Sequence, residues 1–159
     1  MDIIIFKFIF ILLACLTLPH LLLNIVYEKL EKNGLVCVTV PNDYNPFQIA
    51  LYRLNQFSKW WLDPPHHLNY FSFDSLTKLL EKTGFKIVKK ESTFPIDIFL
   101  LMGQNYVGNT DVGKKCHGMR KSFELNLIES GLNDLKRKLY EKLADLNLGR
   151  EITIIGRKI

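Results

Sequence analysis

Two apolar runs separated by an amphipathic segment constrain the fold of this chain more than any other feature. Residues 3–13 and 35–40 are almost wholly apolar, and the second run is rich in β-branched side chains. Such runs are typical of strands that are buried on both faces of a parallel sheet. Between them, apolar side chains recur with helical spacing at Leu23, Val26, Tyr27 and Leu30. We therefore predict a strand, a helix that begins near Pro19 and a second strand, joined by a right-handed crossover.

The N-terminal stretch is also open to a second interpretation. Residues 3–26 are apolar over a length that could cross a membrane, and Lys7 is their only charge. Pro19 and His20 weaken this interpretation, and the acidic Asp2 is not typical of a signal peptide. We favour the strand and helix, which would leave the protein in the cytoplasm, and keep a membrane-associated segment as the alternative.

Turn and cap residues divide the middle of the chain. Gly34 is available for a left-handed residue at the end of the first helix. A loop and a helix are expected over residues 42–62. Ser72 is suited to cap a further helix, which Gly84 would end, and residues 85–94 read as a strand.

The C-terminal third is predicted to contain two helices and a closing strand. Residues 95–118 are expected to form a loop, because glycine recurs in them. Apolar spacing predicts helices around residues 119–127 and 132–146, and residues 151–157 read as a strand. This alternation of strands and helices predicts an α/β fold with a layered sheet.

Composition excludes several classes of protein. Hydrophobic residues make up 48% of the 159 residues, as in ordinary globular domains, and the net charge of +5 is too mild and dispersed to predict nucleic-acid binding. Three scattered cysteines suggest a reducing compartment without a disulfide framework. Cys116 and His117 supply too few ligands for zinc, so no metal site is expected.

Several short segments, taken in their order and spacing, carry a family resemblance. They are residues 27–34 (YEKLEKNG), 40–46 (VPNDYNP), 65–72 (PHHLNYFS), 74–76 with 84–85, and 149–150 with 156–158. Together they resemble class I S-adenosylmethionine-dependent methyltransferases, and most closely the bacterial small-molecule methyltransferase domain. The resemblance covers nearly the whole chain from about residue 21.

The resemblance implies a Rossmann-like sheet of seven strands whose last strand runs antiparallel. Residues 3–13 and 35–40 would then be the fourth and fifth strands, and residues 85–94 and 151–157 the last two. The chain would be a partial sheet with a helical insertion before the final antiparallel strand, and in this family such insertions often cover the substrate.

On this template we expect residues 1–159 to form one truncated methyltransferase domain. Its parts would be a βαβ remnant (1–41), a substrate-side loop and helix (42–72), a helix and strand (73–94), a helical insertion (95–147) and a terminal strand (150–159).

The resemblance implies S-adenosylmethionine as the cofactor, but its glycine-rich turn has no counterpart here. That turn brings the backbone close to the cofactor, which side chains would prevent, and no glycine precedes Gly34. The polar motif that often follows the fourth strand is also replaced, by Leu13-Ala14-Cys15. We therefore expect a C-terminal half only, with unknown cofactor-binding residues and no activity on its own.

Methyl transfer needs a positioned acceptor and sometimes a general base. His67 is the first candidate base, because it lies between a rigid Pro-Pro pair and two aromatic residues, and a matching histidine lies near the acceptor in some relatives. His66 is the alternative one position earlier. Both could equally be ordinary surface or structural histidines.

The acceptor itself is expected to be a small molecule. Asn42 and Asp43 follow a predicted strand at the end where ligands bind in such sheets, although they also suit a plain turn. Aromatic residues could line an apolar pocket or belong to the core. The aromatic candidates are Tyr44, Trp60, Trp61 and Tyr70.

Overall fold

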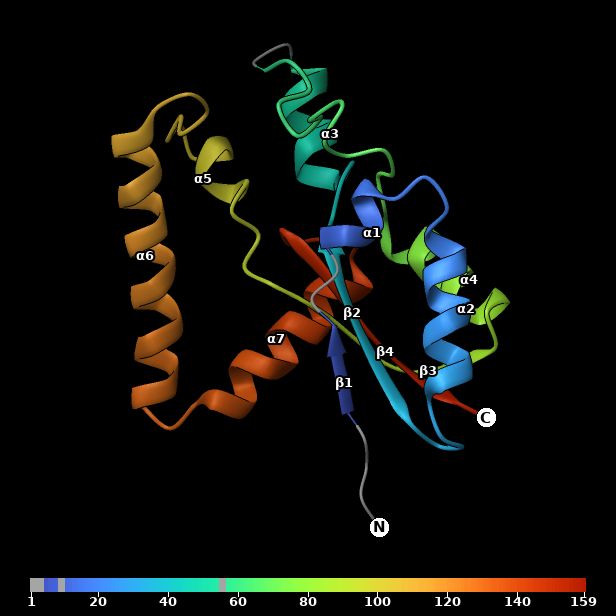
Figure 1. Cartoon of the computed structure of the whole chain (residues 1–159). Helices are drawn as coiled ribbons and strands as arrows, with labels where there is room; N and C mark the ends of the chain where they lie inside the picture. The colour runs from blue at the N-terminus through green and yellow to red at the C-terminus, as the bar shows by residue number, and fades with distance from the viewer. Residues whose placement is uncertain (1–4, 9–10, 55–56) are drawn as a thin grey trace.

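A computed structural model of the chain describes residues 5–8, 11–54 and 57–159, and its central feature is a mixed sheet (Figure 1). The strands are β1 (Ile5–Phe8), β2 (Leu35–Pro41), β3 (Phe85–Ser92) and β4 (Glu151–Lys158). Their order in the sheet is β1-β2-β4-β3. β1 and β2 are parallel, as predicted, and β4 is antiparallel to both of its neighbours. The predicted α/β class is confirmed.

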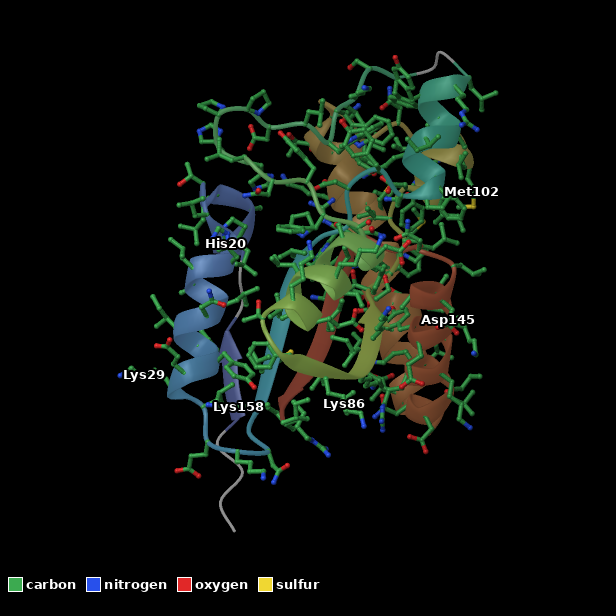
Figure 2. All side chains as sticks on the ribbon, turned by 90° about the vertical axis from the view of Figure 1, so that its right-hand side faces the viewer. His20, Lys29, Lys86, Met102, Asp145 and Lys158 are labelled. Carbon is green, nitrogen blue, oxygen red and sulfur yellow. The ribbon has the colours of Figure 1, made fainter. Side chains whose placement is uncertain are left out.

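Helices lie on both sides of the strands. They are α1 (Ile11–Cys15), α2 (Pro19–Lys29), α3 (Pro46–Arg53), α4 (Phe73–Lys82), α5 (Ile98–Leu101), α6 (Thr110–Glu129) and α7 (Asn133–Asp145). Figure 2 shows α2, which carries Lys29, and α7, which ends at Asp145, on opposite sides of the strands. Figure 1 shows α3 beyond the carboxyl end of β2, and α6 standing apart from the sheet.

The core lies between the sheet and the pair α2 and α4. Alternate residues of β2 are buried, so that one face of this strand is wholly apolar, and β4 adds Ile152 and Ile154 beside it. Onto this face α2 contributes Leu23 and α4 contributes Leu76 and Leu80. All five side chains are fully buried in one continuous cluster, and this burial is the main stabilising term of the fold.

Helix α4 begins where its sequence predicted. The side chain of Ser72 accepts a hydrogen bond from the backbone N–H of Ser75, and the side chain of Ser75 accepts one from the backbone N–H of Ser72. This reciprocal pair satisfies two of the N–H groups that a helix start leaves without partners. Gly84, with a φ of +103°, turns the chain from α4 into β3.

The predicted first strand is wrong over its second half. β1 covers only Ile5–Phe8, and Ile11–Cys15 forms helix α1; residues 3, 4, 9 and 10 lie outside the described part. A continuous apolar run has no periodicity that separates a buried strand from a buried helix, so the sequence could not place this boundary. None of the helices in the described residues combines the length and apolar character that a membrane span requires.

The end of α2 also differs from the prediction. Asn33 adopts the left-handed conformation, with a φ of +67°, whereas Gly34 does not. A side chain on Gly34 would approach the carbonyl oxygen of Glu31 to 2.9 Å. Glycine is therefore required at position 34 for a close backbone approach, and asparagine tolerates the left-handed turn beside it.

The loop expected over residues 95–118 is wrong in large part. The segment contains α5 and the first nine residues of α6, a helix that Asn109 caps by accepting from the N–H of Val112. Gly113 and Gly118 lie inside α6, where an added Cβ would meet nothing within 4 Å. Glycine lowers helix propensity without forbidding a helix, and the long helical register around these two positions outweighs their effect.

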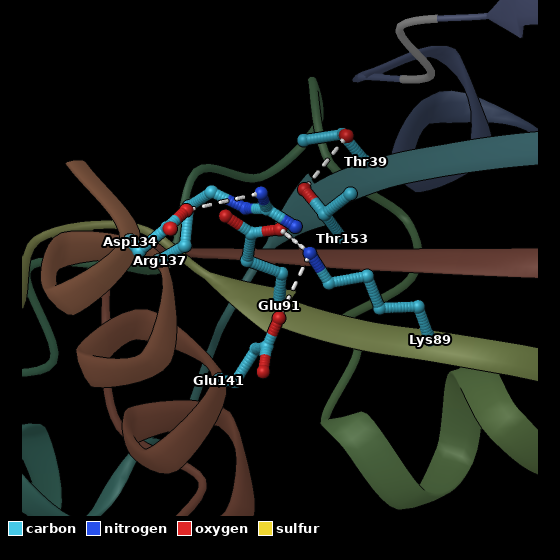
Figure 3. Close-up of polar contacts among 7 residues, drawn as sticks. All are labelled: Thr39, Lys89, Glu91, Asp134, Arg137, Glu141 and Thr153. Carbon is cyan, nitrogen blue, oxygen red and sulfur yellow. Dashed lines mark hydrogen bonds and ion pairs between the residues drawn. The ribbon is translucent and has the colours of Figure 1, made fainter.

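Helix α7 lies where apolar spacing predicted a helix, but it does not bury its leucines. Its buried residues are Tyr140 and Ala144, whereas Leu135 and Leu139 are exposed. A charged contact joins this helix to β3, because Lys89 Nζ lies 2.9 Å from Glu141 on α7 and 2.7 Å from Glu91 on its own strand (Figure 3). Polar side chains thus supplement the apolar packing between α7 and β3.

A stability prediction follows from the two glycines of α6. Gly118→Ala is expected to raise the free energy of unfolding by about 0.5–1 kcal/mol, because alanine loses less backbone entropy in a helix and position 118 is exposed. Gly103→Ala is the matched control, since Gly103 also has open space around it but a φ of +84°, and it should destabilise. Urea unfolding followed by circular dichroism measures both, and a destabilised Gly118→Ala would contradict the helix.

Candidate functional site

A cavity of about 330 Å³ lies at the carboxyl end of β2. Residues from several separate parts of the chain line it: Pro41, Asn42, Asp43, Gln48, Trp60, Trp61, His67, Asp97, Tyr106, Arg150 and Glu151. Because β4 runs antiparallel to β2, its first residue meets the last residue of β2, and Glu151 pairs with Pro41. A larger and more open depression of about 790 Å³ runs along the start of α6 and shares only Tyr106 with this cavity.

The loop after β2 is fixed by its own side chains. Asn42 donates through Nδ2 to the carbonyl oxygens of Asn147 and Gly149, at 3.0 and 3.1 Å. Asn45 caps α3, because its side chain accepts from the N–H groups of Phe47 and Gln48. These contacts join the end of β2 to α3 and to the turn before β4, so the loop is held from both sides.

Two buried carboxyl groups, those of Asp43 and Asp97, line this cavity. Asp97 accepts a 2.8 Å hydrogen bond from the hydroxyl of Tyr106 and a 3.0 Å bond from Asn45 Nδ2. Asp43 is only 5% exposed. Burial raises the pKa of Asp43 to about 6, with a further contribution from the charge of Asp97, and the charge of Arg150 opposes the rise. Asp43 therefore changes protonation near neutral pH.

Burial also raises the pKa of Tyr106, together with the charge of Asp97 beside it and the hydrogen bond that Tyr106 donates to Asp97. The phenol of Tyr106 consequently stays protonated and keeps donating to Asp97.

Three buried polar atoms of the lining residues have no hydrogen-bond partner among the described residues. They are Asn42 Oδ1, Asp43 Oδ2 and Trp61 Nε1. The orientation of the Asn42 amide is not ambiguous, because its nitrogen faces two carbonyl oxygens, so the orphan atom is the oxygen. Buried polar groups are normally paired, so two acceptors and one donor here are complementary to a bound polar molecule.

His67 lines the cavity, whereas His66 does not. The backbone N–H of His67 donates to Asp63 O at 2.9 Å, and the next two residues, Leu68 and Asn69, donate to the carbonyl oxygen of Ala14. The loop is thus fastened to the end of α1, and this holds His67 at the cavity. The His66 side chain instead points to solvent and contacts Asp63 at 3.1 Å, with 75% of its surface exposed.

The aromatic candidates gather at one wall of the site. The Tyr44 ring lies edge-on to Trp61 at 5.5 Å and to Tyr70 at 6.4 Å, and Trp61 lies edge-on to Trp60 at 4.9 Å between ring centroids. Trp60 and Trp61 line the cavity itself, whereas Tyr44 and Tyr70 do not, although Tyr44 contacts Trp61. Tyr70 also accepts from the N–H of Asp63, which ties this cluster to the His67 loop.

Sequence reasoning missed Asp97, Tyr106 and Arg150, which close the other side of the cavity. The first two lie in the segment that is expected to be a loop within the helical insertion, and no site residue is expected in it. Asp97 carried one usable signal, since it is a lone acidic residue within the apolar stretch Phe94-Pro95-Ile96-Asp97-Ile98. Arg150 lies in one of the segments that carry the family resemblance, but no local pattern assigns it to the site, because only the pairing of β2 with β4 brings it to this place.

The family match falls on the elements that form most of this site. Residues 13–90, from α1 to the middle of β3, match the family described as a methyltransferase domain. Over these residues the chain is similar to the methyltransferase domain family. The class I S-adenosylmethionine-dependent resemblance is thereby confirmed for the methyltransferase domain, and it implies that the protein is a transferase by family. No curated protein matches the chain.

Methyltransferases of this class use S-adenosylmethionine, so we tested whether the described residues of the methyltransferase domain fit it. A cradle for this cofactor needs glycine in a turn from the carboxyl end of a strand to a helix. None of the nine glycines of the chain lies in such a turn. The turns after β2 and β3 contain only residues with side chains. The described residues therefore do not fit the cofactor by themselves.

Proposed function

We propose that the cavity binds the small-molecule acceptor of an S-adenosylmethionine-dependent methyltransferase. The three orphan polar atoms carry this proposal, because they leave two acceptors and one donor for a ligand beside an aromatic wall. The two acceptors suit a hydroxyl or an amine, which is also the kind of group that accepts a methyl group. The family match supports the reaction class.

The topology of the sheet supports the assignment of its four strands to the last strands of a Rossmann-like methyltransferase sheet. The final strand β4 is antiparallel to β2 and β3, which agrees with the antiparallel last strand that the family resemblance implies. The parallel pair β1 and β2 with its α-helical crossover supplies the Rossmann-like part. Ligands of such sheets bind beyond the carboxyl ends of the parallel strands, where this cavity lies.

Asp43 and His67 are the proposed proton acceptors of the site. A carboxyl group with a pKa of about 6 is largely ionised above pH 7 and can still take up a proton from a nearby hydroxyl or ammonium group. His67 is an alternative base on the facing loop, and both residues line the same cavity. Asn42, Trp61 and the aromatic residues that contact Trp61 would orient the acceptor.

Calorimetric titration with tyrosol, a neutral phenol, tests the acceptor pocket. We expect saturable binding that His67→Gln weakens several-fold, because its imidazole lines the cavity. His66→Gln is the matched control, since the neighbouring side chain faces solvent, and it should leave the affinity unchanged. Equal affinities for the two variants, or no binding by the unaltered chain, would remove the support for an acceptor pocket here.

Cofactor binding is tested separately by equilibrium dialysis with tritiated S-adenosylmethionine. Because no strand-to-helix turn among the described residues contains glycine, we expect no saturable binding to the purified chain up to millimolar concentration, and hence no methyl transfer. Saturable binding would overturn the proposal that the cofactor cradle is absent from these residues. This result would leave the assignment of the acceptor pocket unchanged.

A further inference from the structure

A second compartment lies next to the acceptor cavity. This compartment has a volume of about 520 Å³ and shares Tyr106, Arg150 and Glu151 with the acceptor cavity. Its far side is formed by His117 and Arg120 of α6. Tyr106, Arg150 and Glu151 therefore lie between Asp43 and Trp61 on one side and α6 on the other.

Arg120 lines this compartment, and its guanidinium group has N–H donors without hydrogen-bond partners among the described residues. Its side chain is 28% exposed, and its nearest carboxylate oxygen, on Glu124, lies 3.6 Å from Nη1, which is longer than a good charged hydrogen bond. The Arg120 Nε is buried and has no partner among the described residues. Nη2 lies 3.4 Å from Nδ1 of His117. A guanidinium has five N–H donors, and its own surroundings leave most of them available.

The carboxylate beside Arg120 is already engaged elsewhere. Glu124 accepts a 2.7 Å hydrogen bond from the hydroxyl of Tyr140 through the same oxygen that faces Arg120. Glu124 therefore neutralises Arg120 only partly, and it does so from the α7 side of the helix.

Arg150 adds a second cation between the two compartments. No carboxylate of the described residues lies within ion-pair distance of its side chain, although it lies close enough to Asp43 for its charge to oppose the rise of the Asp43 pKa. Acidic and basic side chains therefore lie at opposite ends of the two compartments. Asp43 and Asp97 lie at one end, and Arg120 and His117 lie at the other, with Arg150 and Glu151 between them.

We propose that the methyl acceptor carries an anionic group, a carboxylate or a phosphate, which Arg120 and Arg150 bind in the second compartment. Its hydroxyl or amine then lies at the opposite end, beside Asp43 and Trp61. This inference rests on the proposed acceptor pocket and adds the charge and the polarity of the acceptor to it. Guanidinium groups suit both anions because their planar fork forms two parallel hydrogen bonds.

Four phenols with a common frame and different charges test this inference by calorimetry at fixed ionic strength. Tyramine is cationic, tyrosol is neutral, phloretate carries a carboxylate and tyrosol phosphate carries a phosphate. We expect the better anionic probe to bind at least about tenfold more tightly than tyrosol, as one charge-assisted pair predicts. The order of phloretate and tyrosol phosphate distinguishes the two anions. Tyramine is expected to bind most weakly.

Arg120→Gln should abolish the preference for the anionic probes and leave the affinity for tyrosol unchanged. Arg120→Lys keeps the charge without the fork and should retain part of the preference, with circular dichroism reporting whether each variant is folded. Arg137→Gln is the matched control, because Arg137 pairs with Asp134 on α7 (Figure 3) and lines neither compartment, and its variant should keep the full preference.

The outcomes separate this inference from the proposed function. Equal binding of charged and neutral probes, tighter binding of tyramine, or an unchanged preference in a folded Arg120→Gln variant overturns the anionic acceptor. In each of these cases the His67-dependent binding of tyrosol continues to support the acceptor pocket. Anion-selective binding that His67→Gln does not weaken supports the anion site and contradicts the acceptor pocket instead. Failure of all four probes to bind overturns both.

Discussion

Gly149→Ala is expected to destabilise the protein by about 3 kcal/mol or more, and to abolish binding in the cavity. Gly149 has a φ of +108°, a conformation that residues with side chains rarely adopt. An added Cβ would also lie 2.5 Å from the carbonyl oxygen of Thr93 and would overlap the side chain of Ser92. The carbonyl oxygen cannot move away cheaply, because it belongs to the chain that leaves the end of β3.

The same substitution would act on the site through Asn42. The Asn42 amide donates to the Gly149 carbonyl oxygen, so a displaced turn would release the loop that carries Asp43. Gly131→Ala is the matched control, since Gly131 also has a positive φ, of +77°, but nothing lies within 4 Å of an added Cβ. It should cost only about 1 kcal/mol. Urea unfolding monitored by tryptophan fluorescence measures both, and equal losses would contradict the close packing at Gly149.

Asp43→Asn is expected to stabilise the fold at high pH and to have little effect at low pH. The pKa of Asp43 is raised from 3.8 to about 6, so the folded protein binds the proton more tightly than the unfolded chain does. The contribution of Asp43 to stability is therefore most favourable below pH 4 and is lost as the pH rises toward 6. A shift of this size corresponds to about 3 kcal/mol, which is the upper limit of the gain from a neutral side chain.

The measurement is the free energy of unfolding in urea between pH 4 and pH 8. Asp74→Asn is the control, because Asp74 is an exposed carboxylate in the first turn of α4, where its charge is favourable. That variant should lose a few tenths of a kcal/mol at pH 8. If Asp43→Asn destabilises by the same amount at every pH, then the Asp43 carboxylate is paired in the folded protein and the orphan oxygen assigned here is wrong.

Half of the candidate site could be predicted from the sequence, because its residues follow recognisable local signals. Asn42 and Asp43 come directly after a buried strand, and His67 and Trp61 flank a rigid Pro-Pro pair. The sequence could not choose between His66 and His67. A loop has no periodic pattern that would distinguish two neighbouring positions. The hydrogen bonds from Leu68 and Asn69 to Ala14 decide which ring faces the cavity.

Some of the helices could likewise be predicted from the sequence, and others could not. Ser72 and the stripe of Leu76 and Leu80 determined α4, since a capping residue and helical spacing both act within one turn of the chain. The glycines of α6 led to the prediction of a loop where a helix of 20 residues forms. Helix formation depends on the sum of the helix propensities over the whole segment and on tertiary contacts.

By itself the sequence determined the parallel pair of β1 and β2, the apolar face of β2, the start of α4 and the similarity of residues 13–90 to the methyltransferase domain family. The tertiary structure alone decided that Asp97, Tyr106 and Arg150 meet Asp43 around one cavity. The physical reason is the separation along the chain over which each kind of interaction acts. Propensity, capping and periodicity act between residues a few positions apart, whereas Asp43 and Arg150 are brought together only by the antiparallel pairing of β4 with β2.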